Sequence, residues 1–152
     1  MKIVLIQTPK DIAQCYEAFS ELRPHLKDQD SFIKQVKAQL KEGYTIAAIF
    51  EEDQVAACIG YRVITTLAWG KILYIDDLIT RKQLRRKGYG GKLLDYAIDQ
   101  AKTLECDEVH LDTSFTRHAA HKTYLSKGFH FNCYHLALDL NDHILLELGK
   151  IS

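Results

Sequence analysis

Residues 76–92 read Asp-Asp-Leu-Ile-Thr-Arg-Lys-Gln-Leu-Arg-Arg-Lys-Gly-Tyr-Gly-Gly-Lys, and this stretch decides the fold. Its start belongs to an apolar run that predicts a strand ending at Thr80, and a helical pattern begins at Gly88. Glycines let a backbone approach a ligand closely, and the unpaired N–H groups and dipole of a helix N-terminus favour an anion. The order strand, basic loop, glycines and helix therefore predicts a phosphate or pyrophosphate site.

Positive charge gathers in this loop although the whole chain is neutral. Lys plus Arg and Asp plus Glu number 20 each in the 152 residues. Six cations lie in the loop and the first helical turn, with no acidic residue among them: Arg81, Lys82, Arg85, Arg86, Lys87 and Lys92. The local field favours a polyanionic ligand, whereas the neutral total argues against nucleic acid or an anionic membrane as partner. A solvated basic loop before a glycine-assisted helix start is the alternative interpretation.

Two common nucleotide motifs do not fit the spacing. A P-loop requires a glycine where Arg86 stands and a Ser or Thr where Leu93 follows Gly91 and Lys92. A Rossmann fingerprint also requires a glycine at Leu93. Neither motif is supported.

The flanking segments predict a mixed α/β (α+β) domain. A first strand over 1–7 is followed by helices over 9–22 and from an N-cap at Asp30-Ser31 to Gly43. Strands over 44–50, 55–67 and 71–80, joined by short turns, form an antiparallel meander. A helix over 88–104, a strand over 109–112, a helix over 117–127 and an extended run over 128–140 complete a β-α-β-α-β half. No linker separates a second domain, so one domain over 1–152 is expected.

Two motifs resemble those of the GNAT superfamily of N-acetyltransferases. Arg85, Gly88 and Gly90 match the pattern Gln/Arg-x-x-Gly-x-Gly/Ala, which resembles the acetyl-CoA-binding motif of that family. Residues 119–129, Ala-Ala-His-Lys-Thr-Tyr-Leu-Ser-Lys-Gly-Phe, look like its second signature. The resemblance covers residues 44–140 and implies the GNAT fold, with flanking helices on a mixed sheet. Arg117 departs from it, because many members have Asn there.

The resemblance also implies where acetyl-CoA binds as co-substrate. The loop amides would hold the pyrophosphate, and these belong to Arg85, Arg86, Lys87, Gly88, Tyr89, Gly90 and Gly91. The end of the third meander strand would splay from its parallel neighbour, so that backbone near Leu78 and Ile79 pairs with the pantetheine arm. The thioester would then lie beside Asp76, Asp77 and Tyr124.

The implied reaction is direct attack of a primary amine on the thioester in a ternary complex. A lysine-like amine has a pKa of about 10.4, so a proton acceptor should line the site. Asp76 and Asp77 are the candidates, although strand alternation places them on opposite faces and pairing with nearby basic residues is an equal alternative. By resemblance Tyr124 protonates the departing CoA; otherwise it is a buried aromatic.

The acceptor is not identified by the sequence. A small-molecule or peptide amine would bind among the N-terminal helices and meander turns, where the candidates are Tyr16, Phe19, Arg23, His25, Glu51, Glu52 and Trp69. A non-catalytic acyl-CoA-binding sensor or partner module is the alternative function. No metal site is predicted. The run Ile144-Leu145-Leu146-Glu147-Leu148 makes a homodimer an expectation. A cytoplasmic location is expected because no apolar run is long enough for a signal or membrane segment.

Overall fold

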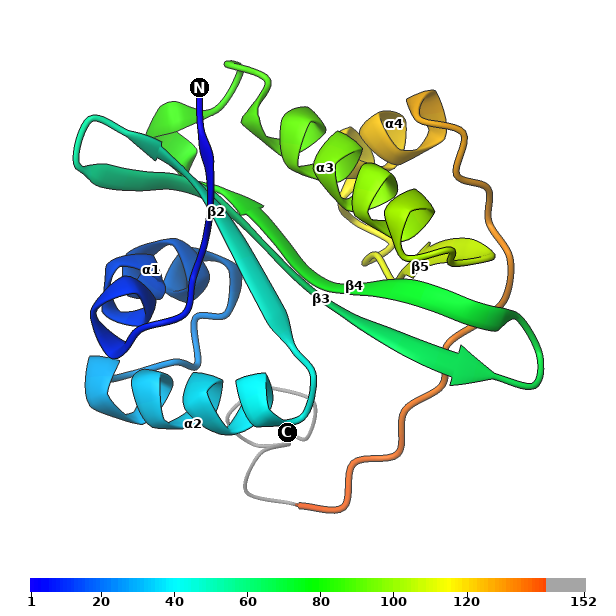
Figure 1. Cartoon of the computed structure of the whole chain (residues 1–152), viewed down its shortest axis with the longest axis horizontal. Coiled ribbons are helices and arrows are strands. Elements are labelled where there is room, and N and C mark those ends of the chain that lie inside the picture. The colour runs from blue at the N-terminus through cyan, green and yellow to red at the C-terminus, as the bar shows by residue number, and fades with distance from the viewer. Residues whose placement is uncertain (142–152) are drawn as a thin grey trace. The chain divides into compact units, whose positions relative to one another are not determined.

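The computed structural model describes residues 1–141, and the chain falls into two compact units, Met1–Asp112 and Thr113–Ser152. The first unit contains a five-stranded sheet in the order β1-β2-β3-β4-β5 (Figure 1). Its strands are β1 (Ile3–Leu5), β2 (Thr45–Glu51), β3 (Gln54–Thr66), β4 (Gly70–Thr80) and β5 (Glu108–Leu111). The first three neighbouring pairs are antiparallel, and β4 pairs with β5 in parallel. The expected meander and mixed sheet are confirmed.

Three α-helices of the first unit begin where the local sequence provides caps or glycine. Helix α1 (Pro9–Leu22) starts with a capping box in which Thr8 and Asp11 exchange hydrogen bonds, with Pro9 in the first turn. Helix α2 (Gln29–Lys41) is capped by Asp28, whose carboxylate accepts from the Ser31 N–H at 2.7 Å. The predicted cap at Asp30-Ser31 is wrong, because Asp28 is the residue with the extended backbone that capping requires. Helix α3 (Tyr89–Thr103) follows Gly88.

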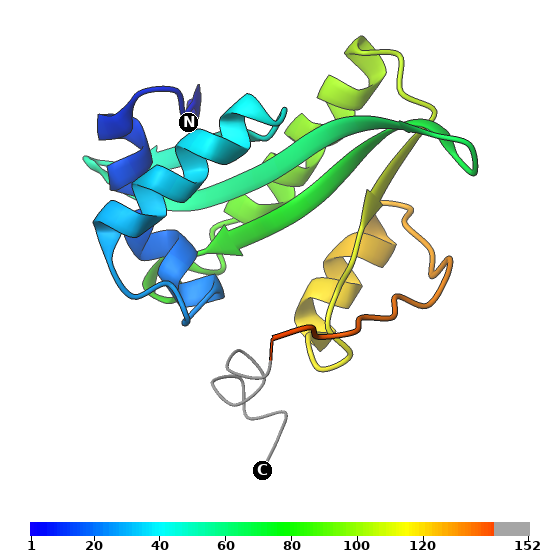
Figure 2. The same cartoon turned by 90° about the horizontal axis from the view of Figure 1, so that it is seen from below.

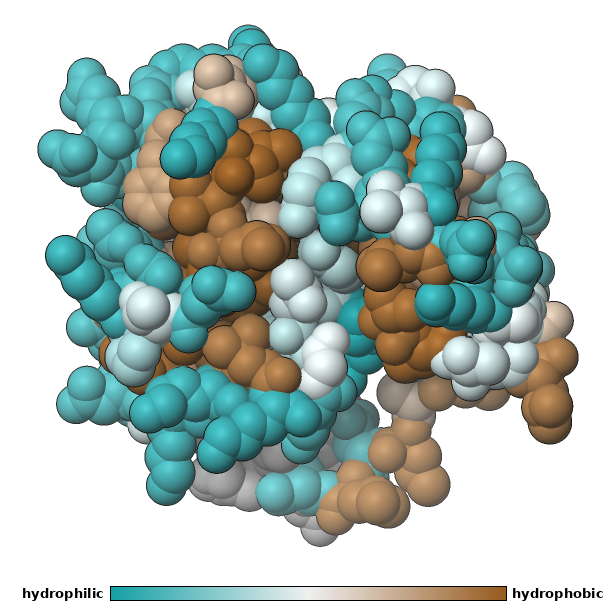
Figure 3. Space-filling model, viewed as in Figure 1, coloured by the Kyte–Doolittle hydropathy of each residue, from teal (hydrophilic) through white to brown (hydrophobic). Residues whose placement is uncertain are grey.

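Helices cover both faces of the sheet. Figures 1 and 2 show α1 and α2 against one face and α3 against the other. Alternation along β2 supplies both sides, since Ile46 and Ala48 join the core under α1 and α2, whereas Ala47 and Ile49 are buried on the opposite face. The outer side of α2 is hydrophilic, as the lower left of Figure 3 shows.

A β-bulge interrupts the pairing of β3 with β4. Gly60 pairs with Asp77, but the next residue, Tyr61, pairs with Ile75, so Asp76 is the extra residue on β4. A bulge re-aims the side chains around it. On β3, Tyr61 beside the bulge packs against Tyr96 of α3, on one face of the sheet. On β4, Ile79, two residues after Asp77, lies in the core under α1 and α2, on the other face. Asp76 and Asp77 therefore both face the α1 and α2 side, and the expectation that they lie on opposite faces is wrong.

The described part of the second unit contains α4 (His118–Ser126) and a chain segment that follows it. Residues 128–141 form no strand, so the prediction of a last strand in the β-α-β-α-β half is wrong. The apolar alternation slips by one residue between Cys133 and Tyr134, which puts its two halves on opposite faces of any strand. Phe131 and Leu140 are exposed accordingly. The predicted dimer segment at 144–148 lies outside the described residues.

Candidate active site

The backbone between β4 and α3 forms an open loop, which we call the cradle. A short 3-10 helix, η1 (Lys82–Leu84), leads to Arg85 in an extended conformation. Arg86 and Gly88 then both take positive φ, at 68° and 81°. No side chain caps α3, and its first backbone bond runs from the Lys92 N–H to the Gly88 carbonyl at 3.1 Å. The N–H groups of residues 89–91 stand before that bond, which makes this helix start a donor surface.

The glycines of this loop leave space rather than fill it. A Cβ atom added at Gly88 or Gly91 would meet no heavy atom within 4 Å, and one at Gly90 would meet only the Thr80 hydroxyl, at 3.5 Å. Gly88 is further required by its left-handed backbone, which L side chains rarely adopt. The surface beside the N-terminus of α3 is therefore accessible to a ligand.

The charge of the loop is partly neutralised by carboxylates from distant segments. Arg81 lies 2.9 Å from Glu17 and 3.5 Å from Glu21, both on α1, and Lys87 lies 2.6 Å from Glu51. More of the positive charge is thus neutralised than the sequence indicates. Within residues 1–141, no ion pair involves the four remaining cations: Lys82, Arg85, Arg86 and Lys92.

Strand β4 continues beyond its parallel neighbour. The pairing of β4 with β5 ends at Ile75 and Leu111, whereas β4 runs to Thr80. Leu78 and Ile79 lie in this extension and pair on their other side with Ile59 and Cys58 of β3. The edge of β4 at residues 76–80 is consequently not used by β5 and begins beside the basic loop.

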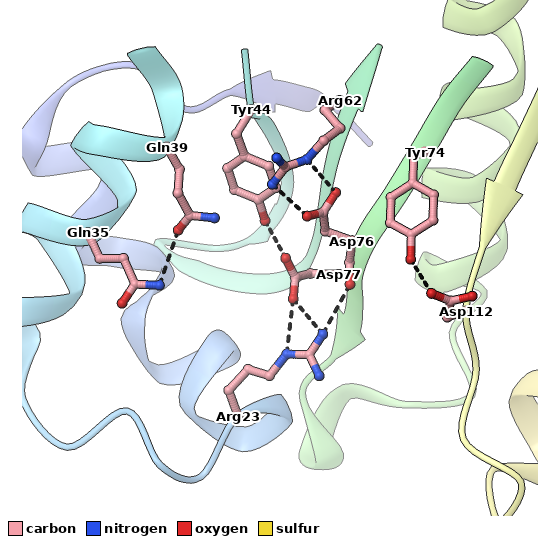
Figure 4. A network of polar contacts seen from close by, with 9 residues as sticks. All are labelled: Arg23, Gln35, Gln39, Tyr44, Arg62, Tyr74, Asp76, Asp77 and Asp112. Atoms are coloured by element: carbon pink, nitrogen blue, oxygen red, sulfur yellow. Dashed lines mark hydrogen bonds and ion pairs between the residues drawn. The ribbon is translucent and has the colours of Figure 1, made fainter. Parts of the chain in front are cut away.

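Two carboxylates and two guanidinium groups gather at the bulge with a buried phenol (Figure 4). Asp77 accepts from the Tyr44 hydroxyl at 2.5 Å and from Arg23 Nη2 at 2.9 Å. Asp76 accepts from Arg62 at 3.1 and 2.7 Å, and its carbonyl accepts from Arg23 at 3.0 Å. We call Arg23, Tyr44, Arg62, Asp76 and Asp77 the bulge cluster. It includes both predicted carboxylates and one predicted acceptor residue, Arg23.

Burial raises the pKa of two groups in this cluster, Asp76 and Tyr44. Burial raises the pKa of the Asp76 carboxyl, and the hydrogen bonds from Arg62 oppose that rise. The pKa of Tyr44 is raised by burial and then by the charge and hydrogen bond of Asp77. Asp76 is the more exposed carboxylate, with 22% of its side chain accessible against 14% for Asp77. Asp76 therefore combines a raised pKa with access from outside.

A second phenol–carboxylate pair, missed by the sequence analysis, lies on the same side of β4. The Tyr74 hydroxyl donates to Asp112, which follows β5. Burial and this bond raise the pKa of Tyr74, and Asp76 adds to the rise. Tyr74 is two residues before Asp76 and pairs with Arg62 across the strands. Neither residue carries a motif, so only the parallel pairing of β4 and β5 reveals the pair.

In the second unit Tyr124 lies on α4, as predicted, and its side chain is buried. Its ring packs on Phe129 at a centroid distance of 6.1 Å, and its carbonyl accepts from the Phe129 N–H at 3.2 Å. Burial raises the pKa of its hydroxyl, and Arg117 partly offsets this. The phenol is therefore protonated at neutral pH, as a proton donor must be.

The other acceptor candidates separate in space. Phe19 belongs to the buried core, and Tyr16 donates to the Leu26 carbonyl. Trp69 packs against His110 beside the β3–β4 turn, with tilted rings whose centroids are 4.4 Å apart. Glu51 accepts a hydrogen bond from Lys87 of the basic loop at 2.6 Å. Within residues 1–141, no hydrogen bond or ion pair joins the side chain of His25 or Glu52 to the bulge cluster.

The chain belongs to the Acetyltransferase (GNAT) family, whose model matches residues 11–131. An uncharacterized N-acetyltransferase of Bacillus subtilis (strain 168), YhdJ, is 34% identical over 131 residues, covering 85% of this chain and 92% of that protein. This membership makes the protein an acetyltransferase by family.

Solved acetyltransferases share the fold at lower identity. A ribosomal-protein-alanine N-acetyltransferase from Brucella melitensis biovar Abortus 2308 matches with a TM-score of 0.78 and 11% identity, over 92% of this chain and all of that one (100%). Glucosamine-6-phosphate N-acetyltransferase from Arabidopsis thaliana gives 0.75 and 19%, over 93% and 100%. In the described residues, no helix is long and apolar enough to cross a membrane, and no three His, Cys, Asp or Glu side chains cluster to hold a metal.

Proposed function

We propose that the protein transfers the acetyl group of acetyl-CoA directly to a primary amine within a ternary complex. The observation that carries this proposal is the cradle at the start of α3, where uncapped N–H groups, accessible glycines and unpaired cations coincide. A pyrophosphate carries the charge and the acceptor oxygens that such a cradle binds. Family membership supports acetyl-CoA as the source of that pyrophosphate.

In the proposed complex the pyrophosphate accepts hydrogen bonds from the backbone of Arg85 through Gly91. The pantetheine arm then extends along the edge of β4 that β5 leaves open, beside Leu78 and Ile79. Its amides would pair with the strand backbone as another strand does. This placement directs the thioester toward the bulge, where Asp76 and Asp77 lie.

The reaction forms a C–N bond and breaks the C–S bond of the thioester. The amine must be neutral to attack, and we assign Asp76, directly or through water, to accept its proton. Both carboxylates accept hydrogen bonds on both oxygens, but Asp77 is the less exposed of the two, at 14% against 22%, so Asp77 is the weaker candidate for the base. Tyr124 is proposed to donate a proton to the sulfur as CoA leaves. A general acid contributes about a hundredfold or more, so Tyr124→Phe should lower kcat with little change in CoA affinity.

The acceptor is proposed as a small-molecule or peptide amine that arrives as a cation near the bulge. Carboxylates and phenols at the bulge suit such a group. A protein alanine and an amino-sugar phosphate are the acceptors named for two proteins of this fold, so the fold itself does not select among them. A cytoplasmic location and a homodimer stay predictions.

Gly90→Asp tests the binding half of this proposal. A Cβ at Gly90 has room, so the variant should fold, but its carboxylate would lie in the cradle and repel phosphate. We expect calorimetry to detect no CoA binding by Gly90→Asp. Gly90→Asn is the matched control with the same shape and no charge, and it should retain more affinity. Unchanged affinity in a folded Gly90→Asp protein would show that CoA binds elsewhere.

Turnover separates the proposal from its alternative. A panel of amines is screened for acetyl-CoA-dependent thiol release by the wild-type protein. A transferase gives release that depends on one class of amine and yields the acetylated product by mass spectrometry. A CoA-binding sensor binds CoA tightly in calorimetry and gives no product with any amine.

A further inference from the structure

One carboxylate of the β2–β3 turn binds both sides of the glycine that begins α3. Glu51, the last residue of β2, accepts from Lys87 Nζ at 2.6 Å with one oxygen. Its other oxygen accepts from the Tyr89 hydroxyl. Lys87 and Tyr89 directly precede and follow Gly88, so a single side chain bonds to the residues on both sides of this glycine.

The loop has few other restraints of its own. Among the described residues, no backbone N–H from Arg85 through Gly91 donates to a carbonyl. At the loop's start Glu21 accepts from the Lys82 N–H at 2.9 Å, and Glu51 provides the corresponding restraint at its end. The Tyr89 ring is itself fixed, since only 6% of the residue is accessible. Besides these side chains, the loop is held by the bonds from Arg85 Nε to the Thr80 carbonyl at 3.4 Å and from the Lys92 N–H to the Gly88 carbonyl at 3.1 Å.

Two effects of Glu51 on a bound pyrophosphate oppose each other. Its negative charge lies near the site and would repel phosphate, yet Lys87 compensates that charge at 2.6 Å. Its hydrogen bonds hold the backbone donors in one arrangement before the ligand arrives, which removes an ordering cost from binding. The bonds from Lys87 and Tyr89 lower the pKa of Glu51, so the carboxylate is ionised at neutral pH and the restraint is present there.

We propose that Glu51 is a positioning residue for the pyrophosphate loop, which it holds in the conformation that binds the phosphate-bearing half of acetyl-CoA. The inference rests on the proposed function. The sequence analysis predicted Glu51 to lie at the acceptor site, whereas this inference gives it a role in the loop. Glu51 acts through Lys87 and Tyr89 and does not touch the reacting atoms.

The neighbouring carboxylate Glu52 provides a matched control. Glu51→Gln and Glu52→Gln remove the same charge from the same turn, but only Glu51 bonds to the loop. We expect calorimetry to give about tenfold weaker CoA binding for Glu51→Gln, because charge-assisted bonds are lost. Glu52→Gln should bind CoA as well as the wild type or slightly more tightly. An equal change in CoA affinity in both variants, whether a loss or a gain, would overturn the inference, because the removed charge alone would then explain it.

A truncated thioester tests whether the effect requires the phosphates. Glu51→Gln should raise the KM for acetyl-CoA at nearly constant kcat, and should leave kcat/KM for acetyl-pantetheine, which has no pyrophosphate, unchanged. Tyr89→Phe should reproduce part of the affinity loss and add little to Glu51→Gln in the double variant. An equal loss with both thioesters would indicate a general structural defect and contradict the proposal. Wild-type protein that fails to bind CoA would instead contradict the proposed function.

Discussion

The loop between β4 and α3 and the bulge cluster lie at the two ends of one stretch of β4 and are built in opposite ways. The loop contains consecutive residues, from Arg85 through Gly91, whose backbone N–H groups donate to no carbonyl of the described chain, and its Arg85 and Arg86 form no ion pair there. The bulge cluster joins residues from α1, the start of β2, β3 and β4, and each of its carboxylates is already bound by an arginine. The loop thus offers interactions to a ligand, whereas the cluster mostly satisfies its own.

This difference separates binding from stability. Arg23 caps the end of α1 and binds Asp77 and the Asp76 carbonyl, so it connects that helix to the sheet. Tyr44 is buried and donates to Asp77. A change in the cluster should therefore disturb folding, while a change in the loop should mainly alter CoA affinity. The predictions below test that separation, from the largest expected effect to the smallest.

Gly60→Ala is expected to have the largest effect. The added Cβ would lie 1.7 Å from the Tyr44 hydroxyl oxygen and 2.3 Å from the adjacent ring carbon. Tyr44 would have to move and lose its bond to Asp77. Overpacking of this kind costs about 3 kcal/mol in the free energy of unfolding, measurable by urea denaturation.

Gly91→Ala is the matched control in the loop. A Cβ there meets nothing within 4 Å, and the residue lies inside the first turn of α3. Alanine should raise the free energy of unfolding by roughly 0.5–1 kcal/mol, because glycine is a poor helix former. Similar destabilisation by both substitutions would show that the two regions do not differ as described.

The loop could be predicted from the sequence because its chemistry is local. Glycine spacing, charge and the strand-to-helix order are all visible within residues 76–92, and the structure places a cradle there. Most element boundaries followed from apolar periodicity and the meander from its short turns, whereas the parallel neighbour of the third meander strand came from the family resemblance. The segment 128–140 was the exception, since alternation indicates an apolar face but not a partner strand.

The bulge cluster could not be predicted because it depends on pairing between distant segments. Two adjacent aspartates in a regular strand point to opposite faces, and only the register shift at Gly60 turns Asp76 to the side of Asp77. The space above Gly60 is occupied by Tyr44, which the sequence places in a different strand. The actual partners, Arg23 and Arg62, are also not the basic residues nearest in sequence.

Asp76→Asn and Asp77→Asn divide the cluster into a catalytic and a structural carboxylate. If Asp76 accepts the amine proton, Asp76→Asn should lower kcat about a hundredfold. Asp77→Asn should change kcat less and lower the free energy of unfolding by about 1–3 kcal/mol, because an amide N–H₂ would face Tyr44 or Arg23. Steady-state kinetics and urea denaturation measure the two effects on each variant.

The pH dependence provides a second readout for Asp76. Its pKa is raised above 3.8 by burial, so it loses its proton, and can act as a base, only above that raised pKa. Wild-type kcat/KM should therefore fall as pH drops through it, and Asp76→Asn should lack this acidic limb. A larger rate loss in Asp77→Asn would reverse the two assignments.

Arg86→Gly tests the smallest effect and separates binding from stability within one residue. Arg86 has φ 68°, which is strained for an L residue, so glycine should remove about 1 kcal/mol of strain and lose somewhat less through unfolded-state entropy. The expected net change is a stabilisation of about 0.5 kcal/mol. Arg85→Gly is the control: Arg85 has φ −70° and gains no relief, and its Nε bond to the Thr80 carbonyl is lost, so this variant should be destabilised. Both variants lose one exposed cation beside the cradle and should bind CoA about threefold more weakly.

Urea denaturation and calorimetry on both proteins would then give opposite changes in stability and the same change in affinity. Destabilisation of Arg86→Gly would show that the positive φ carries no strain, and unchanged CoA affinity in both would show that these arginines do not reach the phosphates.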